Sequence, residues 1–226
     1  MAASDKPKFY YFQGRGKGEM IRLTCAAAGV EFDEISVTTR EDYLKLIEEG
    51  KLLFKQLPLF EIDGLTLVGS DSIVRYVARK ADLYGQTNAD KTRIDILVMG
   101  AKDLFDYGVG GYLFGSSPEQ FVDEKVLPLA RNKYLPAFEK TLAENGSGYM
   151  VGSSLTIADI LVFDCLTHCT ESPLPQLASV LKDYPKCDAF VKFIASHPKL
   201  KDYVPTRYPI PTAEYIHSVK STLLMK

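Results

Sequence analysis

Two tyrosines and a glycine-rich loop near the start of the chain form the pattern with the clearest chemical potential. Tyr10 and Tyr11 lie in a short aromatic run, and the loop Gly14–Gly18 follows before a helical stretch begins. Such a loop can hold a dinucleotide in the pattern G-x-G-x-x-G, but the last glycine of that pattern is replaced here by Glu19. The loop is therefore predicted to be a turn or the rim of a small-ligand site. Because adjacent strand residues face opposite sides of a sheet, at most one of the two tyrosines can enter that site.

Two other patterns each allow a structural and a chemical interpretation. Ser70–Ser72 precedes a helical stretch and is typical of an N-cap, which is the favoured interpretation. The same position can bind a carboxylate, since free N–H groups and the positive end of the helix dipole meet there. Cys165, His168 and Cys169 share one helical stretch, where core packing is favoured over metal binding, and no metal site is predicted.

Strand and turn patterns in the first 84 residues predict an α/β domain. Its elements follow in the order β-α-β-α-β-β-α. Asp63-Gly64 lies between two apolar runs and predicts a two-residue type I′ hairpin, and Gly29 is predicted to end the first helix. The Leu57-Pro58 bond beside this hairpin is equally compatible with a cis and a trans peptide.

Helix patterns predict which side chains face the core and where helices begin. A charged helix over residues 40–49 is predicted to turn Leu44 and Ile47 inward. Thr156 and Asp159 have the spacing of a capping box ahead of an apolar run, so a buried helix is predicted to start there.

After residue 84 the strand patterns end and only helical patterns remain. Pro128 and Pro136 are predicted to bend or divide a helical stretch over 119–145. We therefore predict an α/β domain over residues 1–84 and an all-α domain over residues 85–226.

The composition excludes several classes of protein. Lys+Arg 27 against Asp+Glu 29 gives a net charge of −2, without the basic excess of a nucleic-acid-binding protein. No run of about 18 apolar residues occurs, so no membrane span is predicted. The four cysteines form no C-x-x-C pair, and the first residues contain no apolar leader segment. These features predict a reduced, cytoplasmic protein.

A set of short segments, in order along almost the whole chain, carries a resemblance to a known family. The segments are Lys6–Phe12, Gly14–Gly16, Ala26–Phe32, Phe54–Pro58, Glu61–Gly64, Leu83–Gly85, Tyr134–Lys140, Val151–Gly152 and Leu155–Asp159. Together they resemble the cytosolic glutathione transferases, nearest to the alpha class, with the sigma class next. The resemblance implies a thioredoxin-like domain that binds glutathione as co-substrate and a helical domain that holds a hydrophobic electrophile. It implies no cofactor.

The resemblance places the catalytic phenol on Tyr11, with Arg15 beside it. A thiol of pKa about 8.5 is mostly protonated at neutral pH, and only the thiolate is a good nucleophile. A tyrosine hydroxyl that donates to the sulfur favours the anion. The implied reaction is attack of the glutathione thiolate on the electrophile.

The resemblance also implies the residues that contact both substrates and the second subunit of a homodimer. The implied glutathione contacts are Tyr11, Lys17, Lys51, Gln56, Leu57, Pro58, Gly69, Ser70, Asp103 and Lys133. The implied electrophile pocket takes Tyr10, Gly14, Tyr107, Gly111, Ile216 and Leu223. At the implied dimer interface Phe54 is an aromatic key, and Ile96 and Phe138 line the partner's pocket for it.

Two positions depart from the family pattern. Gly69 stands where a glutamine usually contacts glutathione, and Ile47 stands where the alpha class has an arginine for the glycyl carboxylate, a role that Lys45 or Lys51 could take. Conjugation is therefore expected, with two alternatives. One is a glutathione-dependent isomerase or peroxidase that acts on lipid-derived substrates. The other is a non-catalytic hydrophobic-ligand carrier or crystallin-like relative.

Overall fold

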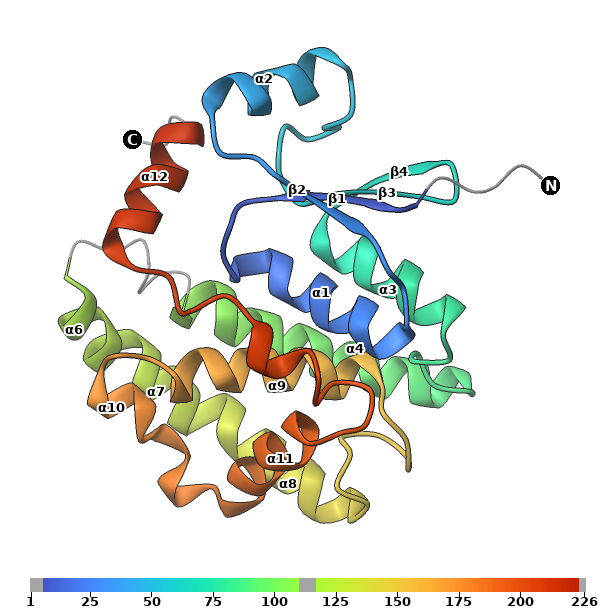
Figure 1. The fold of residues 1–226 in the computed structure, drawn as a ribbon. Helices are drawn as coiled ribbons and strands as arrows, with labels where there is room; N and C mark the ends of the chain where they lie inside the picture. Colours follow the sequence, from blue (N-terminus) through green and yellow to red (C-terminus); the bar gives the residue numbers. More distant parts are fainter. Residues whose placement is uncertain (1–5, 110–116, 224–226) are drawn as a thin grey trace.

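The computed structural model describes residues 6–109 and 117–223, which form an α/β part and a helical part (Figure 1). The strands are β1 (Lys8–Tyr11), β2 (Asp33–Ser36), β3 (Leu59–Ile62) and β4 (Leu65–Val68). The helices of the α/β part are α1 (Gly16–Ala28), α2 (Arg40–Glu48) and α3 (Ser70–Lys80). The order of elements predicted for the α/β part is confirmed.

The sheet has the strand order β2-β1-β3-β4, which puts β1 in its interior. β1 runs parallel to β2, with Tyr11 opposite Ser36, and antiparallel to β3, with Phe9 opposite Phe60. α1 and α3 cover one face of the sheet and α2 covers the other (Figure 1). Because side chains alternate along a strand, Phe9 and Tyr11 pack in the core with α1 and α3, whereas Tyr10 packs with α2.

Glycines end the elements of the α/β part as the sequence predicts. Asp63 and Gly64 have φ values of 54° and 76°, so both central residues of the hairpin adopt the positive φ that a type I′ turn requires. Gly29 ends α1 in the left-handed conformation, with φ 67°. Both predictions are confirmed.

The inward face of α2 differs in part from the predicted one. Tyr43 and Leu46 are buried and Ile47 is half-buried, whereas Leu44 is 38% exposed. The inward stripe therefore follows positions 43, 46 and 47. The prediction for Leu44 is wrong, because a count of aliphatic residues overlooks Tyr43, whose ring packs into the core while its hydroxyl donates to a backbone carbonyl.

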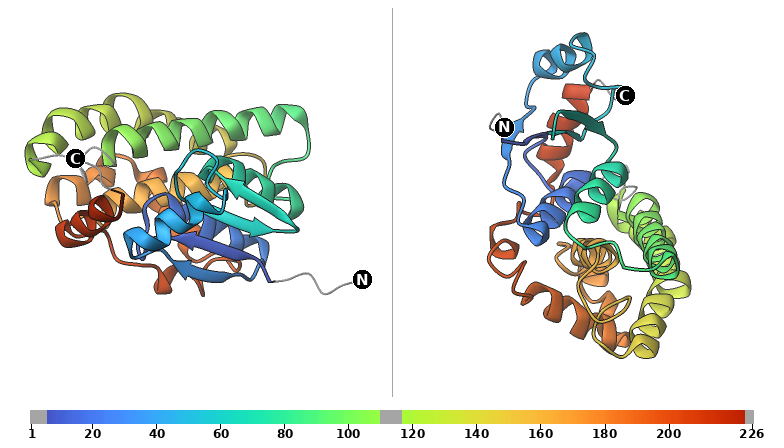
Figure 2. Two further views of the ribbon diagram at one scale, coloured as in Figure 1. Left: turned by 90° about the horizontal axis from the view of Figure 1, so that it is seen from above. Right: turned by 90° about the vertical axis from the view of Figure 1, so that its right-hand side faces the viewer.

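The helical part is built around α9. Its elements are α4 (Asn88–Asp103), η1 (Leu104–Val109), α6 (Pro118–Phe121), η2 (Val122–Val126), α7 (Leu127–Leu129), η3 (Ala130–Tyr134), α8 (Leu135–Asn145), α9 (Ile157–Thr170), α10 (Pro175–Ala178), η4 (Val180–Asp183), α11 (Pro185–Ala195), η5 (Val204–Thr206) and α12 (Ala213–Leu223). The predicted capping box starts α9, with the Thr156 N–H donating to Asp159 Oδ2 at 2.7 Å. Every residue of α9 from Ile157 to Cys169 is buried, and α1, α4 and α11 pack around it (Figure 2).

Pro128 and Pro136 do not divide the helical stretch, which continues from Pro118 to Asn145. The π-helical turns η2 and η3 precede the two prolines. A proline removes one backbone N–H and crowds the carbonyl of the preceding turn, and a wider turn relieves that crowding. The helix therefore continues across both prolines.

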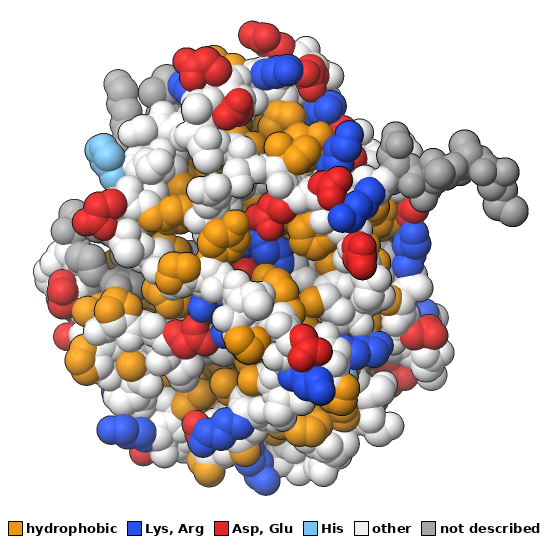
Figure 3. Space-filling model, in the orientation of Figure 1, with side chains coloured by type: hydrophobic (Ala, Val, Ile, Leu, Met, Phe, Trp, Pro, Cys, Tyr) orange, Lys and Arg blue, Asp and Glu red, His pale blue; other side chains and the backbone are white. Residues whose placement is uncertain are grey.

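The end of the chain returns from the helical part to the sheet. α12 stands beside α2 (Figure 1), and the Arg40 Nη1 atom donates to the Thr222 carbonyl at 3.0 Å. Acidic and basic side chains are interspersed over the face shown in Figure 3. Within residues 6–109 and 117–223, no helix combines the length and apolar character needed to cross a membrane.

Candidate active site

Tyr11 ends β1 and reaches the first turn of α1. Its buried ring stacks on Phe9, with ring centroids 5.9 Å apart, and lies 5.3 Å from the ring of Phe12. Its hydroxyl oxygen accepts a hydrogen bond from the backbone N–H of Lys17 at 2.9 Å. That bond uses a lone pair of the oxygen and leaves the phenolic hydrogen to donate to a ligand.

The alternating glycines of the loop make room for two tyrosine rings. A Cβ added to Gly18 would lie 2.4 Å from Cδ1 of Tyr11, and one added to Gly16 would lie 2.7 Å from the Tyr11 hydroxyl oxygen. A Cβ added to Gly14 would lie 2.4 Å from the Tyr215 hydroxyl of α12. The loop therefore lets aromatic side chains approach its backbone, a role that the sequence pattern alone does not reveal.

Burial raises the pKa of Tyr11 above its ordinary value, while the Lys17 N–H and the charge of Arg22 act in the opposite direction. The phenol therefore stays protonated at neutral pH. A protonated phenol can donate a hydrogen bond to a thiolate.

Arg22, a residue that the sequence analysis missed, holds the backbone that follows Tyr11. Its Nη1 atom donates to the Gly14 carbonyl at 2.8 Å, and its Nη2 atom donates to the Phe12 carbonyl at 3.3 Å. Its guanidinium carbon lies 5.8 Å from the centroid of the Tyr11 ring, and Nη2 lies 2.5 Å from Glu34 Oε1. The available signal was the spacing of Glu19 and Arg22, two oppositely charged residues three positions apart in a mostly apolar helical stretch.

The C-terminal segment holds Arg15, the residue predicted to act beside Tyr11. Its Nη1 atom lies 2.6 Å from Glu171 Oε2, and its Nε atom donates to the Tyr208 carbonyl. The Arg15 side chain is only 7% exposed. The guanidinium is thus paired with the carboxylate of Glu171, which is 36% exposed, rather than left open beside the phenol.

Lys17 lies beside Tyr11 and links the α/β part to the helical part. Its backbone N–H belongs to the bond with Tyr11, while its Nζ atom lies 3.0 Å from Asp106 Oδ1 in η1. The ammonium therefore spans the gap between α1 and the helical part.

Tyr10 and Lys51 lie together on the opposite face of the sheet from Tyr11. The Tyr10 hydroxyl donates to Glu61 Oε2 at 2.7 Å. The Lys51 Nζ atom lies 3.1 Å from Glu61 Oε1 and 3.2 Å from Glu49 Oε2. The structure therefore does not bring Tyr10 beside Tyr11, because successive strand side chains alternate, and it pairs the charge of Lys51 with two carboxylates.

The N-terminus of α3 meets a cis peptide bond at one end of the β3–β4 hairpin. The Leu57-Pro58 bond is cis, and the pairing of β3 with β4 puts Pro58 and Gly69 at the same end of the hairpin. Gly69, with φ 81°, is the N-cap, and no side chain of the described residues caps the helix. The N-cap interpretation of Ser70 is therefore wrong. Ser70 is the first helical residue, and it is buried.

The remaining predicted glutathione contacts lie in two places. Gln56 is exposed and Leu57 is half-buried, next to the cis bond. Asp103 and Lys133 meet at Tyr134, whose hydroxyl donates to Asp103 Oδ2 at 3.2 Å and whose ring centroid lies 4.7 Å from Lys133 Nζ. The structure thus places Asp103 of α4 and Lys133 of η3 against the same tyrosine side chain.

The buried face of α12 includes a tyrosine that the sequence analysis missed. Val219 and Thr222 are buried, and Tyr215 precedes them on the same face and contacts the loop at Gly14. Burial raises the pKa of Tyr215, and the nearby Tyr11 raises it further. The predicted pocket residues Ile216 and Leu223 are half-buried. Gly111 and the side chain of Tyr107 lie outside the described residues.

The three predicted interface residues have different environments. Phe54 is 71% exposed and Ile96 is 63% exposed, which is unusual for large apolar side chains. Phe138 is 2% exposed and stacks on Tyr134 within the core of its own chain. Phe138 is therefore enclosed by its own chain, unlike the two exposed side chains, and the structure does not present it to line a partner's pocket.

Both parts of the chain match a known protein family. Residues 7–79 match the Glutathione S-transferase, N-terminal domain, and residues 110–207 match the Glutathione S-transferase, C-terminal domain. The chain is 39% identical over 223 residues to Glutathione S-transferase alpha-4 of Rattus norvegicus, covering 96% of this chain and 98% of that protein. It is 38% identical over 228 residues to Glutathione S-transferase 3 of Gallus gallus, covering 97% and 96%.

Solved structures show the same fold. The glutathione S-transferase from Ascaris lumbricoides matches with a TM-score of 0.78 at 33% identity, covering 92% of this chain and 98% of that one. The monomeric glutathione S-transferase Na-GST-3 from Necator americanus matches with a TM-score of 0.79 at 30% identity, covering 89% and 97%. These matches confirm the predicted thioredoxin-like domain followed by an all-α domain. The chain therefore belongs to the glutathione S-transferase family.

Proposed function

We propose that Tyr11 activates glutathione by donating a hydrogen bond from its hydroxyl to the sulfur. The observation that carries this proposal is the Lys17 N–H bond to the Tyr11 oxygen, which orients the phenol at the N-terminus of α1. Donation stabilises the thiolate over the thiol and lowers the pKa of the thiol. The thiolate then attacks the electrophilic atom of a hydrophobic substrate, to form the conjugate.

The N-terminus of α3 is the proposed site for the γ-glutamyl carboxylate of glutathione. Gly69 offers no side chain there, so the backbone N–H groups and the Ser70 hydroxyl are the donors. The backbone of Leu57, ahead of the cis Pro58, is proposed to pair with the cysteinyl unit as an added strand would, with Gln56 next to it.

The surface between the loop and α12 is proposed to hold the electrophile. Gly14 and Tyr215 face each other there, and Ile216 lies next to Tyr215. The hydroxyl of Tyr215 is a second donor on the Tyr11 side of the sheet. In this proposal residues 1–84 hold glutathione and residues 85–226 supply most of the electrophile site. Four free cysteines, all buried, support a reducing, cytoplasmic environment.

Immobilised glutathione provides the test of this function. The full chain is expected to be retained on the matrix, to elute with free glutathione, and to conjugate glutathione to an aryl halide. Failure of both retention and turnover would contradict the proposal and favour a non-catalytic carrier. Product analysis with a ketosteroid and a lipid hydroperoxide distinguishes conjugation from isomerase and peroxidase reactions.

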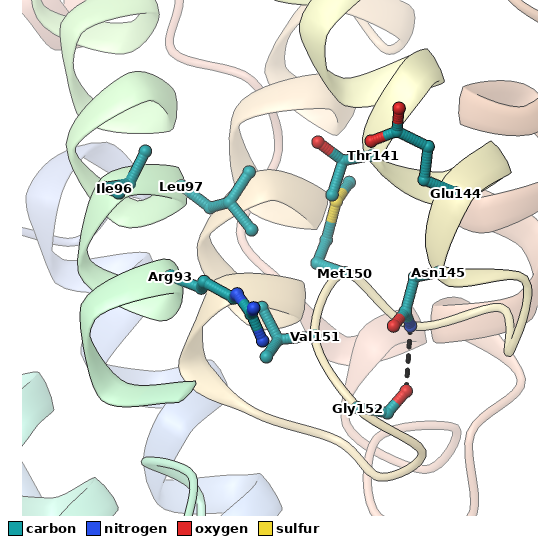
Figure 4. A pocket seen from close by; sticks show the side chains of 9 residues that line it. All are labelled: Arg93, Ile96, Leu97, Thr141, Glu144, Asn145, Met150, Val151 and Gly152. Atoms are coloured by element: carbon teal, nitrogen blue, oxygen red, sulfur yellow. Dashed lines mark hydrogen bonds between the residues drawn. The ribbon is translucent and has the colours of Figure 1, made fainter. Parts of the chain in front are cut away.

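We further propose that two copies associate through Phe54. A pocket of about 450 Å³ lies between α4 and α8, and Ile96, Leu97 and Thr141 are among the residues that line it. Figure 4 shows Leu97 pointing toward Thr141 and Met150 on the opposite wall. An exposed aromatic side chain and a pocket on the same chain, lined by apolar residues such as Leu97 and Met150 together with polar ones, are the two halves of a reciprocal interface.

Phe54→Ala is expected to weaken this dimer by about 30-fold or more, because a buried aromatic anchor contributes about 2 kcal/mol or more to binding. Sedimentation velocity over a concentration series measures the change in the dimer dissociation constant. Leu44→Ala is the matched control, since Leu44 is also an exposed apolar side chain. Equal dissociation constants for wild type and Phe54→Ala would contradict the proposed key.

A further inference from the structure

Glu171, directly after α9, holds two buried arginines that come from distant parts of the chain. Its Oε2 atom lies 2.6 Å from Arg15 Nη1, and its Oε1 atom accepts a hydrogen bond from Arg207 Nη2 at 2.5 Å. The side chains of Arg15 and Arg207 are 7% and 4% exposed. We call Arg15, Glu171 and Arg207 the arginine clasp. One carboxylate, itself 36% exposed, thus contacts two guanidinium groups that are almost entirely removed from water.

The two arginines are attached with unequal strength. Arg207 also donates to Thr167 Oγ1 at 3.0 Å and to the Val204 carbonyl at 3.2 Å, and its guanidinium carbon lies 5.2 Å from the centroid of the Phe163 ring. These contacts fix Arg207 to α9 and to its own segment. The contact of Arg15 with Glu171 is a close ion pair that lacks the alignment of a hydrogen bond. Its strength therefore depends on the charge of Glu171.

The arginine clasp lies between the loop over residues 14–18, here called the catalytic loop because it lies beside Tyr11, and the start of α12. Arg15 follows Gly14 in the loop, and its Nε atom donates to the carbonyl of Tyr208, the residue after Arg207. A short connection then leads to α12, where Tyr215 packs over Gly14. The arginine clasp therefore holds the start of the segment that brings Tyr215 to the site.

We propose that Glu171 is a positioning residue that, through Arg15 and Arg207, holds the start of α12 against the catalytic loop and so sets Tyr215 over Gly14. Glu171 acts through the two arginines and not on glutathione itself. This inference rests on the proposed function, because it assigns Tyr215 to the electrophile side of that site. It assigns Arg15 a role in holding α12, in addition to any effect of its charge on the thiolate.

Removal of the carboxylate charge is expected to open the arginine clasp at Arg15. Two buried guanidinium groups would then lose the one carboxylate that contacts both of them, and a buried charge without its partner destabilises the folded arrangement. Arg207 keeps its other contacts, so we expect the Arg15 and Tyr208 side to separate. Tyr215 then no longer packs over Gly14.

Glu171→Gln tests the proposal because it keeps the shape of the side chain and removes its charge. We expect hydrogen exchange of residues 208–223 to accelerate about tenfold or more, and the KM for the electrophile to rise about tenfold. The KM for glutathione and the pKa of the bound thiol are expected to stay within about twofold and about 0.3 unit of wild type. An unchanged KM for the electrophile, or an equal rise in both KM values, would overturn the proposal.

Two further variants separate positioning from general loss of stability. Arg207→Gln is expected to reproduce the rise in the KM for the electrophile, and the double variant with Glu171→Gln is expected to be no worse than either single variant. Fully additive effects would contradict a shared clasp. Asp188→Asn is the matched control, since Asp188 forms an exposed ion pair with Lys192 at 2.5 Å, and it is expected to leave both KM values unchanged.

Failure of this inference and failure of the proposed function give different results. If wild type neither binds glutathione nor conjugates it, the proposed function fails. If wild type is active and Glu171→Gln shows wild-type exchange in α12 and wild-type KM values, only the positioning role of Glu171 fails.

Discussion

Tyr11→Phe is expected to raise the pKa of the glutathione thiol in the complex by about one to two units. A hydrogen bond to a charged group contributes about 1.5–3 kcal/mol, and each pKa unit corresponds to about 1.4 kcal/mol. The substitution keeps the ring that packs on Phe9 and removes the hydroxyl, which is the proposed donor and also the acceptor of the Lys17 N–H bond. At pH 6.5 we expect kcat/KM to fall about 10- to 100-fold, since the fraction of thiolate falls by that factor.

The direction of the pH dependence follows from the same argument. Raising the thiol pKa moves the rising limb of the pH–rate profile to higher pH, so the loss is largest at pH 6.5 and small above pH 9. Absorbance titration of the bound thiolate measures the pKa directly. Tyr10→Phe is the control, because that hydroxyl donates to Glu61 on the opposite face of the sheet. An unchanged thiol pKa and rate in Tyr11→Phe would show that another group activates the thiol.

Gly18→Ala is expected to lower kcat/KM about 100-fold while leaving the chain folded. The added Cβ would lie 2.4 Å from Cδ1 of Tyr11, so the ring must move by about 1 Å, and a misplacement of that size can cost about 100-fold in rate. Gly18 lies in α1, where alanine favours the helix by about 1 kcal/mol over glycine. The loss of activity should therefore not arise from loss of the helix.

Gly100→Ala provides the matched control for this substitution. Gly100 lies in α4, where an added Cβ would lie 3.7 Å from the Phe138 ring, an ordinary contact. We expect Gly100→Ala to keep its kcat/KM and to unfold at an equal or higher temperature than wild type. Thermal unfolding and steady-state kinetics on both variants make the comparison. Wild-type activity in Gly18→Ala would show that the position of the Tyr11 ring does not limit the reaction.

Much of the fold could be predicted because its signals act between residues close in sequence. Asp63-Gly64 determines a two-residue hairpin through its positive φ values, and Thr156 with Asp159 determines the start of α9 through reciprocal hydrogen bonds. Predictions from the sequence pattern were wrong where packing against another element determines which side chain is buried. Tyr43 rather than Leu44 faces the sheet, a choice that a count of aliphatic residues does not make.

The candidate site was predictable in part for the same reason. Strand alternation requires that only one of Tyr10 and Tyr11 faces the site, and the family resemblance selects Tyr11. The role of Ser70 was harder to predict, because the common use of serine as an N-cap outweighs its use as a ligand at the first helical turn. The structure makes Gly69 the N-cap instead.

Local patterns predicted the α/β and helical halves, and the family resemblance selected Tyr11 as the expected catalytic phenol. The surroundings of that phenol depend on contacts between residues far apart in the chain, which local patterns do not contain. Arg15 and the Tyr208 carbonyl are 193 positions apart, and Tyr215 reaches Gly14 across a comparable separation. The reason is the sequence separation of the interacting residues. Caps and turns form between residues within about four positions of each other. The loop over residues 14–18, Glu171 and α12 meet only when the helical part packs against the sheet.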